Sequence, residues 1–513
     1  MSLEKAKSIE AGMQAVGCDA KQTILEKAKY VWSNMSVEPV LFCYIMPSVM
    51  NTMATQNLSL EKSCRVNLAL GVDVCDALTL RNASAYAAEE ERVQTLATSM
   101  AVWKNVIQSA FASTLLLFLG AWSDRHRRRK PCILAPILGD ITMCLGLLAC
   151  TYFFYELPLE VNTVFESLPP AITGTWFSMF VGVFSYVSDV SSEEERTVRI
   201  GAVNLVYNVS VCVGTALSGI LYSSIGFYGV YCTSLAFYFT GFFYACFALR
   251  DVYELPDTER AGDPVKGQKL WRDLFHFGHA ADTLKSVVKV KGKRGNSKRV
   301  CAIMFLFLVI LGPLYGEFNV VYFYVRYKFG FDAMQYSFFS TFQLVTGSLG
   351  TSFSLSFFSK FLGLDDAILG IISCSSKVLA AGIYAFAPTP FYFYLGAVVE
   401  FLNGTSFIAI RAMISKLVPP EELGKVNSMF GVGEAMVPLI YVPLYSRIYA
   451  HTISVFPGCF YIVGGALIIP AMLIFFWLYR EHEKDLRYEK EMAPTQVALV
   501  KTANDPNQQD DDR

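Results

Sequence analysis

The sequence predicts an all-α membrane protein in which twelve transmembrane helices form two halves of six helices each. Hydrophobic residues make up 53% of the 513 residues, and charged residues make up 17%. The apolar residues gather in runs of about 20, the length of helix that crosses a bilayer. A soluble core would break these runs into shorter or alternating pieces. A polar stretch separates the first six runs from the last six, which is typical of transporters built from two related halves.

The N-terminal half is expected at residues 37–249, after a polar leader at 1–36 that lacks the pattern of a secretory signal. A long loop at 58–97 separates its first two spans. The six spans are predicted at Val37–Gln56, Met100–Trp122, Cys132–Tyr155, Leu168–Val187, Ile200–Ser223 and Phe227–Leu249.

A polar loop at 250–299 leads into the C-terminal half at 300–479, and a charged tail at 480–513 follows. A glutamate cluster follows both the fourth and the tenth span, in Ser188–Gly201 and Ser415–Ser428, which is a weak internal repeat at half-chain distance. The spans of this half are predicted at Val300–Val325, Ala333–Phe358, Ala367–Ala387, Phe391–Leu417, Val426–Ser446 and Ser454–Trp477.

The Lys and Arg content of the loops orients the chain in the membrane. The basic runs Asp124–Lys130 and Lys289–Arg299 fall on the same side as the basic residues of the tail. Both termini and the central loop are therefore expected in the cytosol.

The loop at 58–97 is then extracytosolic, where two kinds of covalent modification are predicted. Asn57 and Asn82 head N-glycosylation sequons. Cys64 and Cys75 share this oxidising side and are expected to form a disulfide, with two free thiols as the alternative.

A glycine, an aspartate and a basic run lie between the second and third spans. The glycine allows close approach of helices, and the aspartate can pair with the arginines at a helix end. The positive-inside rule alone explains the arginines, but it does not explain the glycine and aspartate at this spacing. We interpret the segment as a gating motif made of Gly120, Asp124, Arg125, Arg128 and Arg129.

This motif resembles the one between spans two and three of the major facilitator superfamily. Four further segments, Val37–Val40, Val187–Ser192, Arg196–Arg199 and Ile410–Val418, narrow the resemblance to solute carrier family 46, which includes the proton-coupled folate transporter and the thymic stromal cotransporter. The resemblance implies a major facilitator fold, a rocker-switch cycle and an organic anion as solute. It also implies a place for Arg411 in the transport pathway.

The sequence departs from that family at three points. Arg127 stands where the motif has glycine, and Asn204 stands where the folate transporter has a span-five glutamate. Span seven lacks that transporter's histidine and contains Glu317 instead. Folate is therefore not the predicted solute, and proton coupling would need another carboxylate.

Ionisable side chains inside a span are costly, and they usually face a cavity or a partner. A fixed salt bridge with Glu400 or Glu434 is the alternative role for Arg411. Asn204 and Asn208 lie one helical turn apart, and bonding between helices is their alternative role. The predicted pathway for solute and protons consists of Glu317, Arg411, Lys377, Asn204, Asn208, Asp140, Glu400 and Glu434.

Glu317 is the first candidate for the proton carrier. Gly312, Pro313 and Gly316 would loosen its helix, and broken helices line transporter sites. Burial there disfavours a charged carboxylate. The alternative is a permanently ionised Glu317 paired with Arg411 or Lys377.

These features predict a secondary active transporter that carries a small, anionic organic solute by alternating access, with protons as the coupling ion, in the plasma membrane or an endolysosomal membrane. We found no phosphate-binding GxxxxGK[ST], no metal-ligand cluster and no cofactor motif. The net charge of −1 argues against a nucleic-acid partner. A receptor or sensor on the same fold is the first alternative. A membrane enzyme is less favoured, because Asp140 is the one aspartate deep in a predicted span.

Overall fold

The computed structural model describes residues 35–79, 86–126, 128–191, 193–249, 296–418 and 420–503, and within these ranges the chain is helical with short connections. The leader at 1–34, the central polar segment 250–295 and the last ten residues lie outside the described part. Each of the twelve predicted spans falls on one helix or on two consecutive helices.

The spans of the N-terminal half lie on six helices, two of which follow one another as a pair. They are α3 (Glu38–Lys62), α5 (Ala87–His126), α6 (Lys130–Tyr152), the pair α7 (Leu159–Thr173) and α8 (Thr175–Val190), and α9 (Glu193–Ala248), which holds two spans. Gly226 interrupts α9 with a positive φ of 63°, a conformation that glycine adopts without strain. Gly174, with φ 88°, separates α7 from α8 in the same way.

The C-terminal half repeats this arrangement. Its helices are α12 (Asn296–Phe329), α13 (Ala333–Ser354) with a π-helical turn at Leu355–Phe361, α14 (Asp366–Phe386), α15 (Pro390–Val399), α16 (Thr405–Leu417), α17 (Pro420–Thr452) and α18 (Cys459–Ala503). A single 3-10 turn at Glu400–Leu402 joins α15 to α16. Asp332 begins α13 with a capping box to Gln335, and Asp365 caps α14.

Three expectations about element bounds need correction. The 58–97 loop is largely helical, because α3 runs on to Lys62, a π-helical turn covers Ser63–Asn67, α4 covers Val72–Thr79 and α5 begins at Ala87. The fourth span begins at Leu159, about two turns before the predicted start. The tail is helical as far as Ala503, because α18 continues through it.

Seven helical segments of the described chain are long and apolar enough to cross a membrane, and one of them, Arg199–Ala248, contains two predicted spans. Four predicted spans, on α3, α5, α13 and α17, do not meet this measure. Each of these helices carries polar side chains where it meets its neighbours, such as Asn51 on α3 and Gln343 on α13.

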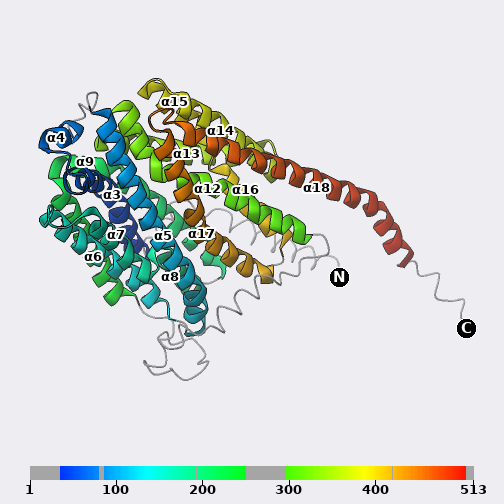
Figure 1. Ribbon diagram of the computed structural model, residues 1–513. Coiled ribbons are helices and arrows are strands. Elements are labelled where there is room, and N and C mark those ends of the chain that lie inside the picture. Colours follow the sequence, from blue (N-terminus) through cyan, green and yellow to red (C-terminus); the bar gives the residue numbers. More distant parts are fainter. Residues whose placement is uncertain are drawn as a thin grey trace, which may run out of the picture.

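The two halves meet along a few helices. Helix α5 packs against α17, and α9 packs against α13. Figure 1 shows the N-terminal half, coloured blue to green, beside the C-terminal half, coloured green to red, with α18 extending away from both. Apolar cores within each half hold it together: one joins α3, α6, α8 and α9, and another joins α12, α14, α16, α17 and α18. This arrangement allows each half to act as a unit.

Candidate functional site

A cavity of about 200 Å³ lies near the middle of the predicted spans, between the halves. Substrate sites of two-half transporters lie at this depth. Tyr315 of α12 and Pro438 of α17 line it from the C-terminal half. The N-terminal half contributes a wall that is partly polar and partly apolar: Tyr44, Ser48, Asn51, Thr52, Thr55, Lys104, Asn105, Gln108, Ser109, Asp140, Met143, Glu166, Pro170, Thr175, Trp176 and Phe177.

The charges in the cavity wall are one lysine and two carboxylates among the described lining residues. The Nζ of Lys104 lies 2.5 Å from Oε1 of Glu166, so these two charges balance each other. Asp140 is 4% exposed, and no cation lies within ion-pair distance of it in the described chain. The wall therefore carries one unbalanced carboxylate.

Three buried charged residues form a second cluster, inside the C-terminal half. Lys377 of α14 donates a hydrogen bond of 2.6 Å to Glu317 of α12 and one of 2.7 Å to Glu400. Glu317, Lys377 and Glu400 are 7%, 3% and 7% exposed, so water screens none of them effectively. Two carboxylates therefore share one ammonium group, and we call these three residues the acid–lysine–acid cluster.

The fold explains how each member of the cluster reaches this place. Glu317 follows Pro313 within α12, and Lys377 lies in the middle of α14. Glu400 begins the 3-10 turn between α15 and α16, where the helix is interrupted. An ion pair of Glu317 with Arg411 or Lys377 was the alternative to its role as proton carrier, and the structure contains the pair with Lys377. None of the three lines the cavity.

The two carboxylates differ in their hydrogen bonds. Glu400 also accepts hydrogen bonds from the Tyr384 hydroxyl at 2.8 Å, from Gln343 at 2.9 Å and from Asn403 at 3.1 Å. Glu317 accepts its bond from Lys377 through Oε2, whereas its Oε1 is buried without a partner. That oxygen faces Gly464, where a Cβ atom would lie 2.5 Å from it.

Arg411 and Glu434 are close enough for their charges to interact, but no ion pair joins them. Arg411 is exposed, and its predicted alternative, a fixed salt bridge with Glu400 or Glu434, is wrong for this structure. The Tyr315 hydroxyl donates to Glu434 at 3.5 Å. Because Tyr315 lines the cavity, Glu434 lies just behind the cavity wall.

Asn204 and Asn208 are exposed on α9 and lie outside the cavity lining. Asn204 donates to the carbonyl of Ile200, and Asn208 donates to the carbonyl of Asn204. Both amides thus bond within their own helix, and neither predicted role, solute contact or bonding between helices, is seen.

The gating motif lies where α5 ends and α6 begins. The side chains of Asp124 and Arg125 and the surroundings of Gly120 lie outside the described part of the structure. Arg129 is buried, and it donates to Asp189 of α8 at 2.8 Å and to Ser123 at 2.7 Å, while the carbonyl of Arg128 accepts from Ser123 at 3.0 Å. The motif thus joins α5, α6 and α8 at their predicted cytosolic ends.

Two asparagines and two cysteines were singled out for the extracytosolic side. Cys64 and Cys75 form a disulfide in the structure. Asn57 is 4% exposed and its Nδ2 donates to the carbonyl of Met53, so the predicted glycan at Asn57 has no room and is withdrawn. Asn82 lies outside the described residues.

Sequence reasoning missed several residues of these sites. Glu166 was not among the predicted site residues, yet α7 places it in the cavity beside Lys104. Asp189 was also not among the predicted site residues, and it pairs with Arg129. Both pairings depend on how the helices are rotated about their own axes. Within the described residues, no group of three or more His, Cys, Asp or Glu could hold a metal ion.

Comparison with known proteins agrees with this architecture. The sequence model of the Major Facilitator Superfamily matches residues 77–399 and 318–504. Similar solved structures include the human organic anion transporter TETRAN, with TM-score 0.54, 15% identity, and 86% of this chain and 97% of that chain covered. The nucleoside transporter NupG has TM-score 0.56 and 11% identity, covering 87% of this chain and 99% of that chain. These likenesses establish the fold.

The curated relatives are distant but similar over most of the chain. A probable peptidoglycan muropeptide transporter of Drosophila melanogaster, named within solute carrier family 46, is 24% identical, covering 94% of this chain and 93% of that protein. The lysosomal proton-coupled steroid conjugate and bile acid symporter of Gallus gallus is 22% identical over 86% of this chain and 93% of that protein. The proton-coupled folate transporter of Rattus norvegicus is 24% identical over 75% of this chain and 80% of that protein. The chain is a multi-pass integral membrane protein, not an enzyme, and it belongs to the Major Facilitator Superfamily.

Proposed function

We propose that this protein is a secondary active transporter that moves a small organic anion together with a proton by alternating access. The observation that supports coupling is the buried cluster in which Lys377 lies between Glu317 and Glu400. Its relatives include proteins named as proton-coupled transporters of folate and of steroid conjugates and bile acids.

The charge balance of the acid–lysine–acid cluster supports the binding of a proton. When both carboxylates are ionised, the cluster has a net charge of −1 inside the membrane region, which is costly unless another positive charge compensates it. A single proton makes the cluster neutral. Gain and loss of that proton therefore give it two electrostatic states, as a coupling site requires.

The hydrogen bonds favour Glu317 as the acid that binds the proton. Four donors face Glu400, and donors stabilise the ionised form of a carboxylate. Glu317 has one donor, and its free Oε1 is the atom at which a proton can bind. Glu317 thus remains the first candidate, now for a reason that the sequence did not contain.

Helix α12 connects this cluster with the cavity. Tyr315, two residues before Glu317, lines the cavity and donates to Glu434. A shift of α12 when Glu317 changes charge would therefore move a cavity wall residue. The same shift would let solute occupancy alter proton binding, as reciprocity requires.

The choice of an organic anion rests on the relatives and on Lys104. Bile acids and folate, named for two relatives, carry carboxylates. Lys104 is the one cation among the described cavity residues, and an anion could take the place of Glu166 beside it. Arg411 and Lys377, which were predicted to lie in the transport pathway, do not line the cavity. Because Asp140 leaves the wall negative, an anion enters more easily when a proton accompanies it.

The test is uptake of a panel of organic anions at neutral and acid pH by membrane vesicles that contain the full chain. We expect uptake to rise as the pH falls on the side from which the solute enters. In Glu317→Gln, whose side chain imitates the protonated acid, we expect the pH dependence to disappear while exchange of solute continues. Glu483→Gln, on α18 beyond the last predicted span, is the control and should keep the parent's pH profile.

Three outcomes would change the proposal. A full pH profile in Glu317→Gln would exclude Glu317 as the coupling site, and the same experiment on Asp140→Asn would then test the cavity carboxylate. Binding of a solute without uptake in the parent protein would indicate a receptor. Uptake that is independent of pH in the parent protein would exclude proton coupling.

A further inference from the structure

Arg326, at the predicted extracytosolic end of α12, joins the two halves. Its Nη1 donates to the side chain of Asn57 on α3 at 3.2 Å, and its Nη2 donates to the carbonyl of Leu78 on α4 at 3.1 Å. Its Nε lies 3.4 Å from Oε1 of Glu90 on α5. The arginine side chain is 10% exposed, and that of Glu90 is 5% exposed. One residue of the C-terminal half is thus held by three elements of the N-terminal half.

Further contacts between the halves surround Arg326. The Tyr322 hydroxyl donates to Asn57 at 2.8 Å, and the Tyr449 hydroxyl donates to Gln94 at 2.8 Å. An apolar cluster that includes Leu78 and Val93 from one half and Phe331 and Tyr445 from the other fills the space between them. Asn105 of the cavity and Glu90 are 15 residues apart on α5, or roughly 22 Å along the helix. These contacts therefore cover the cavity on its extracytosolic side.

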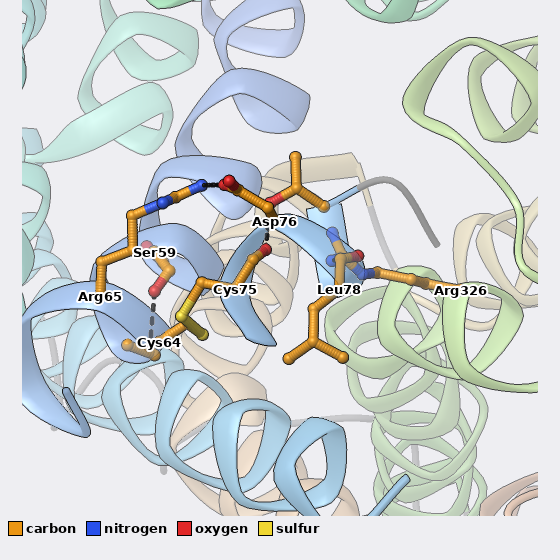
Figure 2. The surroundings of a disulfide bond; sticks show 9 residues. Ser59, Cys64, Arg65, Cys75, Asp76, Leu78 and Arg326 are labelled. Carbon is orange, nitrogen blue, oxygen red and sulfur yellow. Dashed lines mark hydrogen bonds and ion pairs between the residues drawn. A yellow bond between two sulfur atoms is a disulfide. The ribbon is translucent and has the colours of Figure 1, made fainter. Parts of the chain in front are cut away.

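The short helix α4 contributes a carbonyl group rather than a side chain. Leu78 lies in its last turn, where carbonyls lack partners within the helix and attract a cation. Eight residues do not form a stable helix alone. The disulfide from Cys75 to Cys64 and the ion pair of Asp76 with Arg65 attach α4 to the end of α3. Figure 2 shows Cys75 joined to Cys64 on one turn of α4 and Arg326 reaching Leu78 on the next.

We propose that Arg326 is the latch of the extracytosolic gate and that the disulfide-tethered α4 forms part of the socket that receives it. This inference rests on the alternating access proposed above. A polar latch suits a gate that must open in every cycle, because a buried ion pair loses in desolvation much of what it gains in attraction. When the halves separate, water can hydrate Arg326 and Glu90 again, so the latch can open reversibly.

The first test measures access to the cavity from outside. Ser48→Cys places a thiol in the cavity wall, and a membrane-impermeant thiol reagent is applied to cells that display the full chain at their surface. The same chain without this cysteine gives the background from the native cysteines. We expect Arg326→Gln to increase the labelling rate on the order of tenfold, because loss of the latch shifts the population toward the outward-open state.

Arg447→Gln is the matched control. Arg447 is exposed on α17, near the predicted extracytosolic end of that helix, and it has no ion pair in the described chain. Its labelling rate should equal that of the parent. Equal rates for Arg326→Gln and Arg447→Gln, with both proteins at the cell surface, would overturn the proposal.

A second variant separates gate opening from unfolding. Ser218 of α9 and Ser337 of α13 lie across the halves with their hydroxyls 2.8 Å apart, close enough for a disulfide between cysteines at these positions. In Ser218→Cys/Ser337→Cys, oxidation should abolish the extra labelling caused by Arg326→Gln, and a reductant should restore it. Extra labelling that persists after oxidation would mean that Arg326→Gln disrupts the fold, and the latch would be rejected.

The role of α4 is tested by Cys64→Ser/Cys75→Ser. We expect a smaller rise in labelling than with Arg326→Gln, and no additional rise when the two changes are combined. Additive rises would exclude α4 from the socket. Because labelling needs no known solute, failure of every uptake assay would count against the proposed transport and leave the gate result intact.

Discussion

Glu400 and Glu317 have the same side chain and share the same lysine, yet their surroundings give them different roles. Tyr384, Gln343 and Asn403 all direct donors at Glu400, whereas Glu317 has a free oxygen. A glutamine at position 400 would direct its own N–H groups at these donors. A glutamine at position 317 would lose little hydrogen bonding.

We therefore expect Glu400→Gln to destabilise the protein by about 1–3 kcal/mol, the cost of buried polar groups left without partners. Glu317→Gln should cost less than about 1 kcal/mol, because one hydrogen bond is weakened and a buried charge is removed. Thermal unfolding of the purified full chain in detergent measures both. The opposite order of stabilities would contradict the assignment of Glu400 as the permanently ionised acid.

At the scale of residues, the sequence predicted which side chains matter better than how they pair. Glu317, Lys377 and Glu400 were all recognised because charges within spans are costly. The sequence left Arg411 and Lys377 as alternative partners of Glu317, since the choice depends on the rotation of α12 and α14 about their axes, and the position of Glu400 depends on the break at Glu400–Leu402. Arg326 was overlooked because it follows the predicted end of its span, where a basic residue is ordinary.

At the scale of elements, α9 and α13 make one close approach between the halves. A Cβ atom at Gly219 of α9 would lie 2.2 Å from the carbonyl oxygen of Ala333 and 2.5 Å from the hydroxyl of Ser337. The backbone amide of Gly219 also donates to that hydroxyl at 2.8 Å. The absence of a side chain thus sets the distance between the two helices, as small residues do in membrane proteins.

Gly219→Ala should destabilise the protein by about 1–3 kcal/mol, because backbone cannot move aside as a flexible side chain can. Gly201→Ala is the control on the same helix, where a Cβ would meet nothing within 4 Å, and the higher helix propensity of alanine should stabilise it by up to about 1 kcal/mol. Thermal unfolding distinguishes them, and equal unfolding temperatures would show that α9 and α13 do not pack as described.

Helix positions followed from the sequence because an apolar run of fixed length is a strong signal. The breaks within helices did not. Gly174 and Gly226 are two of 35 glycines in the chain, and only the folded structure shows that these two adopt positive φ. Helix α4 was also missed, since eight residues beside a cysteine resemble a loop until a disulfide and Arg326 hold them.

At the scale of the whole molecule, the proposed cycle requires that contacts at opposite ends of the spans form in turn. The latch around Arg326 joins the two halves, while Arg129 and Asp189 link α5, α6 and α8 within one half. The pair formed by Arg129 keeps the motif in place at the predicted cytosolic end. Asp124 belongs to the same motif. A change at Asp124 should therefore alter the rate of the proposed transport cycle.

We expect Asp124→Asn to lower the maximal rate of uptake with little change in apparent affinity, because Asp124 lies on the last turns of α5, far from the cavity. Asp189→Asn, which removes the partner of Arg129, should act in the same direction. Kinetics of uptake over a range of solute concentrations measure both parameters, with protein amount at the membrane as the normalisation. An unchanged maximal rate in Asp124→Asn would refute the gating interpretation.

The single lysine between two acids also has an electrical consequence. If one proton travels with a solute of charge −1, each cycle moves no net charge, and the membrane voltage neither drives nor opposes it. If the solute has charge −2, each cycle moves one negative charge, worth about 2.3 kcal/mol for every 100 mV across the membrane. A current recorded during uptake at fixed voltage would then reveal the valence of the solute, even for a mixture whose transported component has not been isolated.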